Sequence, residues 1–249
     1  MKEFENRSIT VSIVSHGQGK LVTNLLEDLA VCSSVVEVVL TYNIPELDIS
    51  CPDSMKARLR VIRNERPLGF SVNHNQAFKF CKTPYFAVIN PDIRLSADFF
   101  SDLILALDKT DGGVIAPIVV NPAGELEDSA RYFPTLIRLM RKALGLSDGR
   151  INLKNLEVHE IDWVAGMFLF FPQAIFREIR GFDEHFFLYY EDVDICARIW
   201  LSGRRVMLHP GVSVIHDPRR TSRRNLRYMR WHLSSMLRYF AKYAWRLPR

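Results

Sequence analysis

The sequence predicts an α/β fold in which a mostly parallel central sheet is flanked by helices. Short apolar segments rich in β-branched residues alternate with helical segments from the first residues onward, and this alternation is typical of a parallel sheet. The 249 residues are enough for one large domain with a substantial core. Hydrophobic residues make up 48% of the chain and charged residues 24%, which is the composition of a globular protein.

Four short apolar runs predict the strands of the first half of the chain. They are Ile9–Ser15, Val35–Leu40, Arg58–Ile62 and Tyr85–Ile89. Between the first two runs, leucines recur at helical spacing from Leu21 to Leu29, and residues 71–80 predict a second helix.

The second half of the chain is less regular. We expect a helix around residues 136–144 within an irregular region of residues 121–160. Further predicted elements are a strand over Asp162–Phe171, a helix over Pro172–Ile179, a helix over Glu191–Leu201, and strands over Arg205–Leu208 and Val212–His216.

Polar residues follow the predicted strands, at the sheet edge where open parallel sheets bind their ligands. The strand ends are Ser15-His16, Thr41-Tyr42-Asn43 and Asn90-Pro91-Asp92. The Asp92 carboxylate could hold Mg²⁺ or Mn²⁺ against a diphosphate. The same three residues also suit a simple turn, and the residues alone leave both interpretations open.

A second group of acids lies between Asp183 and Asp194, interleaved with aromatic residues. Glu191, Asp192 and Asp194 fall in the first turn of a predicted helix, where acids stabilise the helix end. One of them could instead serve as a general base for a sugar hydroxyl. His216 ends a predicted strand and is either structural or a metal ligand.

Taken in order, these segments resemble the family 2 glycosyltransferases, in particular the bacterial rhamnosyltransferase-like members. The matching segments are ITVSIVSHGQ, PLGFSVNHNQAF, YFAVINPDIRL, DWVAGMFLFFP, and GFDEHFFLYYEDVDICARIWLSGRRV with VIHD. The resemblance covers about Ile9 to Asp217. It implies the GT-A fold, which binds nucleotide-diphosphate sugars, and an inverting, metal-dependent sugar transfer.

The resemblance also implies roles for individual residues. Asp92 matches a residue that binds the divalent cation, Mg²⁺ or Mn²⁺, and His216 matches one that completes the metal shell. Asp192 matches the catalytic base, and Glu191 is expected to assist it and orient the acceptor. The remaining matches are Ser15, His16, Asn43, Gly69, Asn73 and Asn90 on the donor side, with Trp163 and Gly166 on the acceptor side.

One segment departs from the family pattern. The family has an acid-rich element after the second strand, whereas residues 40–45 here (LTYNIP) contain no carboxylate. Asn43 could still hydrogen-bond a base and Tyr42 could stack on it. The departure leaves open a catalytically inactive protein that binds nucleotide sugars or glycans. A nucleotidyltransferase would carry a glycine-rich basic loop after the first strand, which HGQGK matches only weakly.

The subgroup resemblance implies dTDP-L-rhamnose as donor and a glycan or lipid-linked acceptor in polysaccharide or O-antigen synthesis.

Met1–Ser8 lack the apolar core of a signal peptide. No apolar run approaches the roughly 20 residues that span a bilayer, and the four cysteines are scattered. We therefore expect a cytoplasmic protein that can also bind peripherally to the inner face of the plasma membrane.

A basic extension, residues 218–249, is expected to follow the catalytic domain of residues 1–217. From His216 onward the chain has ten Lys and Arg against one acid, while the rest has a net charge of −4. Apolar residues at helical spacing predict an amphipathic helix over residues 222–246, which either packs on the domain or lies on an anionic membrane. No recognised nucleic-acid module accompanies it, so we expect no nucleic-acid partner.

Overall fold

A large mixed sheet organises the part of the chain that this computed structural model describes, which comprises residues 7–146, 155–217, 226–243 and 247. The strand order is β3-β2-β1-β4-β10-β6-β11-β5, with β8 beside β11. Its strands are β1 (Ile9–Ser15), β2 (Val35–Tyr42), β3 (Leu59–Arg63), β4 (Tyr85–Ile89), β5 (Ile93–Arg94), β6 (Gly112–Val120), β8 (His159–Glu160), β10 (Phe168–Pro172) and β11 (Arg205–His216). The short strands β7 (Ala130–Arg131) and β9 (Trp163–Val164) form a separate pair.

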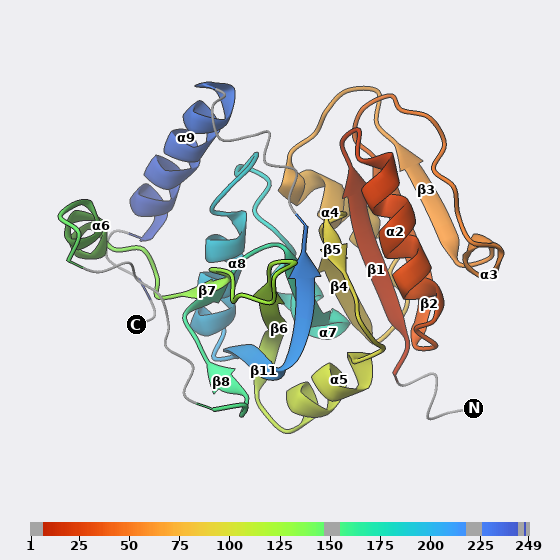
Figure 1. The fold of residues 1–249 in the computed structure, drawn as a ribbon. Coiled ribbons are helices and arrows are strands. Elements are labelled where there is room, and N and C mark those ends of the chain that lie inside the picture. The colour runs from red at the N-terminus through yellow and green to blue at the C-terminus, as the bar shows by residue number, and fades with distance from the viewer. Residues whose placement is uncertain (1–6, 147–154, 218–225, 244–246, 248–249) are drawn as a thin grey trace.

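Helices cover both faces of the sheet (Figure 1). They are α2 (Gly19–Ala30), α3 (Asp53–Lys56), α4 (Phe70–Phe78), α5 (Phe100–Asp108), α6 (Leu136–Ala143), α7 (Gln173–Glu178), α8 (Glu191–Leu201) and α9 (Leu226–Tyr243). Because side chains alternate along a strand, Ala87 and Ile89 of β4 join the core under α2 and α5, whereas Phe86 and Val88 join the core under α4, α7 and α8. The predicted α/β class is confirmed.

The direction of β10 brings two distant segments to one edge of the sheet. The pairs β1–β2, β1–β4, β2–β3 and β6–β11 are parallel, whereas β10 runs antiparallel between β4 and β6. Phe168 therefore pairs with Ile89, and the Asn90 N–H donates to the Met167 carbonyl at 2.9 Å. The start of β10 thus lies beside the end of β4.

Two predicted strand assignments were wrong. The single strand expected over Asp162–Phe171 is divided into β9 and β10, because the Gly166 N–H donates to Asp192 instead of joining a strand ladder. The two strands expected over Arg205–Leu208 and Val212–His216 form one strand, β11, whose pairing with β6 is irregular between His209 and Ser213.

Helix α9 packs on the domain through a face that the apolar pattern did not predict. Ser235, Tyr239 and Tyr243 are buried, while most of the predicted apolar face, including Leu233 and Leu237, is exposed. Of the two alternatives for this apolar face, packing on the domain is therefore wrong for most of its length. Residues 218–225, 244–246, 248 and 249 of the predicted extension lie outside the described residues. None of the described helices is long and apolar enough to cross a membrane.

Candidate active site

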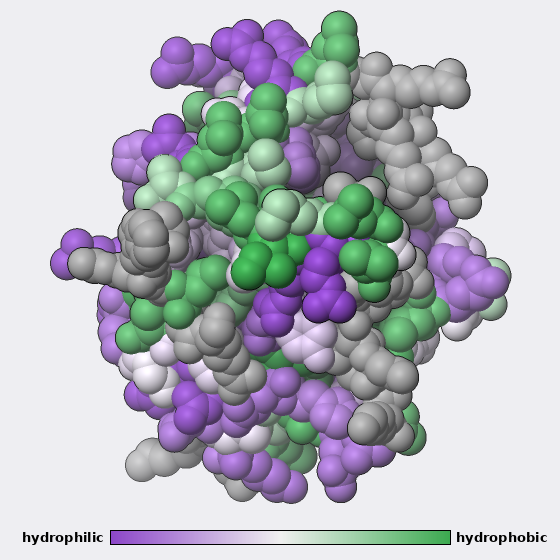
Figure 2. Space-filling view, turned by 90° about the vertical axis from the view of Figure 1, so that its left-hand side faces the viewer, coloured by the Kyte–Doolittle hydropathy of each residue, from purple (hydrophilic) through white to green (hydrophobic). Residues whose placement is uncertain are grey.

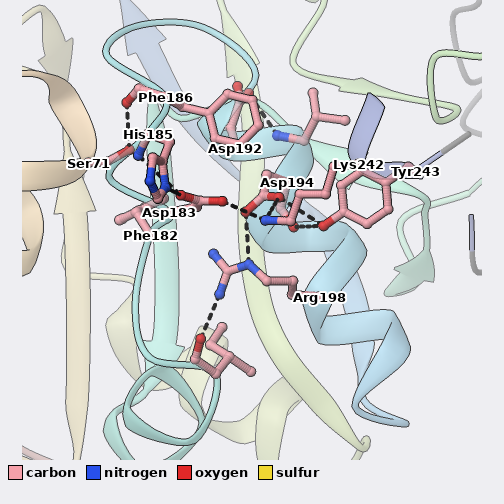
Figure 3. Close-up of polar contacts among 12 residues, drawn as sticks. Ser71, Phe182, Asp183, His185, Phe186, Asp192, Asp194, Arg198, Lys242 and Tyr243 are labelled. Atoms are coloured by element: carbon pink, nitrogen blue, oxygen red, sulfur yellow. Dashed lines mark hydrogen bonds and ion pairs between the residues drawn. The ribbon is translucent and has the colours of Figure 1, made fainter. Parts of the chain in front are cut away.

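Asp192 lies in the first turn of α8 (Figure 3). Two backbone amides hold its carboxylate. Oδ2 accepts a hydrogen bond from the Gly166 N–H at 3.0 Å, and Oδ1 accepts one from the Val193 N–H at 2.8 Å. Burial raises the pKa of Asp192, and these amide hydrogen bonds oppose the rise. A carboxylate that is fixed in place and more basic than usual suits a general base.

The neighbouring Glu191 is buried, with 5% of its surface exposed. Its Oε2 atom has no hydrogen-bond partner. Burial raises the pKa of Glu191 well above its usual value, and the charge of Asp192 adds to the rise. The pair therefore favours a neutral acid at Glu191 beside a charged carboxylate at Asp192, and such a division gives two adjacent acids different chemical properties. A direct contact between Glu191 and the acceptor stays a prediction.

Residues 183–190, which we call the lead-in loop, end in a strained conformation immediately before these acids. Tyr189 and Tyr190 have φ angles of 68° and 66°, in the left-handed region that costs about 1–3 kcal/mol for a residue with a side chain. Contacts from other elements hold the loop in place. They are the hydrogen bonds Ser71 Oγ to Phe186 O (3.1 Å), Phe70 N to Phe187 O (2.9 Å) and Ser235 Oγ to Leu188 O (2.9 Å).

Gly69 allows the donor-side segment to touch the lead-in loop directly. A Cβ atom at this position would lie 2.7 Å from the Phe187 carbonyl oxygen and 2.9 Å from its Cα. Both atoms belong to the backbone and cannot rotate away, so only glycine fits. The predicted donor residue Gly69 is therefore linked by packing to the loop that positions Asp192.

Residues near the end of α9 bind the same region (Figure 3). Lys242 Nζ lies 2.6 Å from both Asp183 Oδ2 and Asp194 Oδ1, and the Tyr243 hydroxyl donates to Asp194 Oδ1 at 2.8 Å. Burial raises the pKa of Asp183, but hydrogen bonds from Lys242 and His185 outweigh it, so the net shift is downward. We call Ser235, Lys242 and Tyr243 the C-terminal brace. Sequence reasoning missed it because no motif marks such contacts.

The predicted metal residues Asp92 and His216 come together from two strand ends. His216 Nε2 lies 3.3 Å from Asp92 Oδ2, and the Asp217 N–H donates to the Asp92 carbonyl at 2.9 Å. The buried Asp92 Oδ1 atom has no partner. An unpaired carboxylate oxygen beside an imidazole nitrogen fits a divalent cation, which takes its other ligands from phosphates and water.

Glu127 binds the other side of the His216 ring, although sequence reasoning did not identify it. His216 Nδ1–H donates to Glu127 Oε2 at 2.6 Å, which leaves Nε2 directed at Asp92. Burial lowers the pKa of His216, but Asp92 and Glu127 raise it above the usual value. A carboxylate behind an imidazole fixes the ring as in known metal sites. Among the described residues, no three or more His, Cys, Asp or Glu side chains are arranged so that they could together hold one metal ion.

A carboxylate does lie beside the ends of β1 and β2, contrary to the apparent departure after the second strand. Ser15 Oγ donates to Glu46 Oε2 at 2.9 Å, and the Gly17 N–H donates to Glu46 Oε1 at 3.2 Å. Glu46 follows Pro45, one residue beyond the segment that lacks an acid. The next predicted residue, His16, is exposed at the same edge.

Asn43 and Asn73 hold the loop that precedes α4. Asn43 accepts from the Leu68 N–H at 2.8 Å and donates to the Leu68 carbonyl at 3.0 Å. Asn73 donates to the same carbonyl at 3.2 Å, and Asn64 donates to both asparagines. These amides organise the donor-side segment, while their contact with the donor stays a prediction.

On the acceptor side, the Trp163 indole N–H donates to the Tyr132 carbonyl at 3.0 Å, which joins β9 to the segment after β7. The chain then reaches Gly166, whose Cα lies close enough to Asp192 that an added Cβ would be 3.7 Å from the Asp192 Cβ. Trp163 and Gly166 therefore belong to the segment that faces the candidate base.

Known structures share this fold. The structure of GalNAc-T7 with UDP, GalNAc and Mn²⁺ superposes with a TM-score of 0.64 at 16% identity, over 85% of this chain and 44% of that one. The mannosyltransferase PcManGT from Pyrobaculum calidifontis, with GDP-Man and Mn²⁺, gives 0.60 at 15% identity, over 94% and 63%. The fold is thus that of the GT-A glycosyltransferases.

Sequence relatives define the family. The model of glycosyl transferase family 2 matches residues 50–180. Rhamnosyltransferase WbbL of Escherichia coli is 28% identical over 94% of this chain and 93% of its own length. The N-acetylglucosaminyl-diphospho-decaprenol L-rhamnosyltransferase of Mycobacterium tuberculosis is 31% identical, over 52% of this chain and 45% of its own length. The chain belongs to glycosyl transferase family 2.

Proposed function

We propose that this glycosyltransferase transfers L-rhamnose from dTDP-rhamnose to a glycan or lipid-linked acceptor, with inversion and with the help of a divalent cation. The names of two relatives, both rhamnosyltransferases, support the sugar. One of these names specifies a sugar on a polyprenyl diphosphate, which supports a lipid-linked acceptor. The proposed role is in bacterial polysaccharide or O-antigen synthesis.

The observation that supports the proposal is that the proposed base, Asp192, and the proposed diphosphate residues, Asp92 and His216, lie at one edge of the sheet. Asp192 accepts a hydrogen bond from Gly166, and the next residue, Met167, accepts one from Asn90. Asn90 is two residues before Asp92, which faces His216. An acceptor hydroxyl at Asp192 would therefore lie near a donor whose diphosphate is at Asp92.

In the proposed mechanism, Asp192 takes the proton of the acceptor hydroxyl as its oxygen attacks the anomeric carbon. The bond from that carbon to the diphosphate breaks, and the nucleotide leaves with the electron pair. Attack from the opposite face inverts the configuration. Asp92 and His216 would hold Mg²⁺ or Mn²⁺, which supplies positive charge to the leaving diphosphate. The Gly166 and Val193 amides keep Asp192 oriented.

The alternative of an inactive binding protein on the same fold is not favoured. It was suggested by the missing carboxylate after the second strand, and Glu46 now supplies a carboxylate at that edge. Asp192 also keeps the fixed, basic carboxylate that transfer requires. A protein that only bound sugars would not need such a group.

The proposed location is the cytoplasm, on the inner face of the membrane that carries a lipid-linked acceptor. The four cysteines are free, which fits a reducing compartment. We also propose that the extension after residue 217 is an appendage of the catalytic domain of residues 1–217, to which α9 is bound through the C-terminal brace.

The test is calorimetric binding of UDP, dTDP, GDP and CMP, with and without Mn²⁺, to the wild type and to Asp92→Ala. We expect Mn²⁺-dependent binding of dTDP that Asp92→Ala abolishes. Asp192→Asn should keep this binding and lose rhamnosyl transfer by about 10²–10⁴-fold. Folded protein that binds no nucleotide, or an Asp192→Asn variant that transfers sugar normally, would contradict the proposal.

A further inference from the structure

One side of the molecule exposes apolar side chains from two helices. On α9, Leu226, Met229, Leu233 and Leu237 are 76%, 63%, 51% and 60% exposed, and we call these four residues the apolar stripe. Helix α6 exposes Leu136, Ile137 and Met140 in the same way, and Leu144 and Leu146 continue this exposure past its end. A cluster of this kind on a soluble domain usually marks an interaction surface.

The apolar stripe faces away from the domain. Its members are three or four positions apart, so they share one side of the helix. The opposite side carries the buried Ser235, Tyr239 and Tyr243. Since α9 is already bound to the domain through those residues, the apolar stripe is not needed for that packing and is left for another partner.

The two helices lie on the same side of the fold, at the left of Figure 1. Figure 2 views the molecule from that side and shows hydrophobic surface gathered over its upper half, with strongly hydrophilic side chains among it. Apolar and polar side chains are thus mixed on one face.

The charge of this face is positive. The sequences of α6 (LIRLMRKA) and α9 (LRYMRWHLSSMLRYFAKY) contain basic residues and no acid. Arg141, Arg230 and Arg238 are exposed. Tyr228 and Trp231 pack against each other at 5.3 Å on α9, half-buried. Apolar, basic and amphipathic aromatic side chains together are what a helix in a lipid headgroup layer presents.

We propose that α6 and α9 form a docking surface for an anionic lipid bilayer, on which both helices lie in the plane of the headgroups. Neither helix can span the bilayer, so the apolar stripe would enter it only at the surface. A second copy of this chain fits less well, because two faces of the same positive charge would meet. Nucleic acid would match the arginines but would leave the apolar stripe uncovered.

The docking surface lies against the lead-in loop. Trp231 contacts Phe187 with ring centroids 4.7 Å apart, and Ser235 binds the Leu188 carbonyl. If the proposed function holds, a bilayer on this surface would present a lipid-linked acceptor close to Asp192. The docking itself does not depend on that function.

The test is sedimentation of the full chain with vesicles of phosphatidylcholine alone or mixed with phosphatidylglycerol, without nucleotide. We expect binding to the mixed vesicles that weakens with salt. Leu233→Gln with Leu237→Gln should lower the partition coefficient at least about tenfold. Arg230→Gln with Arg238→Gln should lower it about tenfold on the mixed vesicles alone.

Control variants change exposed residues of the same types elsewhere. Leu47→Gln removes a leucine that is 91% exposed far from α9 in the sequence, and Lys79→Gln with Lys82→Gln removes two exposed cations. Both controls should bind vesicles as the wild type does. Circular dichroism and nucleotide binding of each variant check that it is folded.

Four results would overturn the proposal. The first is a wild type that does not bind mixed vesicles. The second is an equal loss of vesicle binding in the stripe variant (Leu233→Gln with Leu237→Gln) and in the Leu47→Gln control. The third is a lipid-free dimer that the stripe variant dissociates, since that would assign the face to a second copy. Ile137→Gln with Met140→Gln tests α6 alone, and unchanged vesicle binding there would refute a surface built from both helices.

Discussion

Replacing Lys242 with methionine tests whether the C-terminal brace stabilises the lead-in loop. The ammonium group of Lys242 contacts two carboxylates, Asp183 and Asp194, each at 2.6 Å. Methionine keeps much of the apolar stem and removes the ammonium group with its charge and its hydrogen bonds. Asp194 would keep Arg198 and Tyr243 as partners, and Asp183 would keep His185.

The expected cost lies between those of a surface and a buried ion pair. Exposed pairs contribute about 0–1 kcal/mol, whereas breaking a buried pair costs about 3–5 kcal/mol. The Lys242 side chain is 33% exposed, while Asp183 and Asp194 are 21% and 0% exposed. We therefore expect a loss of about 2 kcal/mol, or a fall in Tm of about 4–8 °C for a domain of this size.

Thermal unfolding followed by circular dichroism measures this loss, with Arg230→Met as the matched control. Arg230 is an exposed cation on the same helix, so its replacement should leave Tm nearly unchanged. Because Lys242 lowers the pKa of Asp183, the stability that it provides is present above the unfolded pKa of about 4. This stability is lost as pH falls through the pKa that Asp183 has in the folded protein. The two proteins should therefore converge in acid.

The same variant should lose more sugar transfer than nucleotide binding, because Lys242 contacts Asp183 and Asp194, which lie close to Asp192 in the chain. A Tm no lower than that of Arg230→Met, or transfer and nucleotide binding lost in equal proportion, would refute the reasoning.

Three further variants test other contacts. Glu191→Gln should gain stability relative to the wild type as pH rises above the ordinary Glu pKa of about 4.5. Burial raises the pKa of Glu191 in the folded protein, so ionising it costs the wild type stability that the glutamine variant keeps. Denaturant titrations measure this difference, and parallel pH profiles would disprove it. Glu127→Gln should weaken Mn²⁺ binding, measured by calorimetry, about 10–100-fold if it orients His216, and unchanged affinity would refute that role. Gly69→Ala should cost about 1–3 kcal/mol of unfolding free energy through its contact with Phe187; wild-type stability would contradict the steric argument.

Local patterns predicted the parts of the site that depend on strand ends and helix starts. Strand β4 and helix α8 have the predicted bounds, because a short apolar run and an acid-rich first turn are local signals. Both Asp92 and His216 end predicted strands, and the family resemblance implied that they share a metal site; the structure brings them to 3.3 Å.

Contacts between distant segments were not predictable in the same way. Glu46 and Glu127 lie in loops, and nothing in their neighbourhoods indicates that they reach Ser15 and His216. A run of apolar residues does not indicate the direction of a strand. The antiparallel direction of β10 follows only from its pairing with β4 and β6 in the sheet. The helical spacing of apolar residues in α9 predicted an apolar face. The hydrogen bonds of Ser235 and Tyr243 with the domain hold α9 in an orientation that leaves most of this face exposed.

The position of α9 in the chain also affects what a partly made protein can do. Every strand of the sheet precedes α9 in sequence, so the sheet edge that holds Asp92 is synthesised before the C-terminal brace. A nascent chain that stops short of residue 226 would keep the contacts of Phe70 and Ser71 with the lead-in loop. It would lack the contacts of the C-terminal brace. If Lys242→Met loses sugar transfer as expected, full transfer activity would begin only after α9 has docked on the domain.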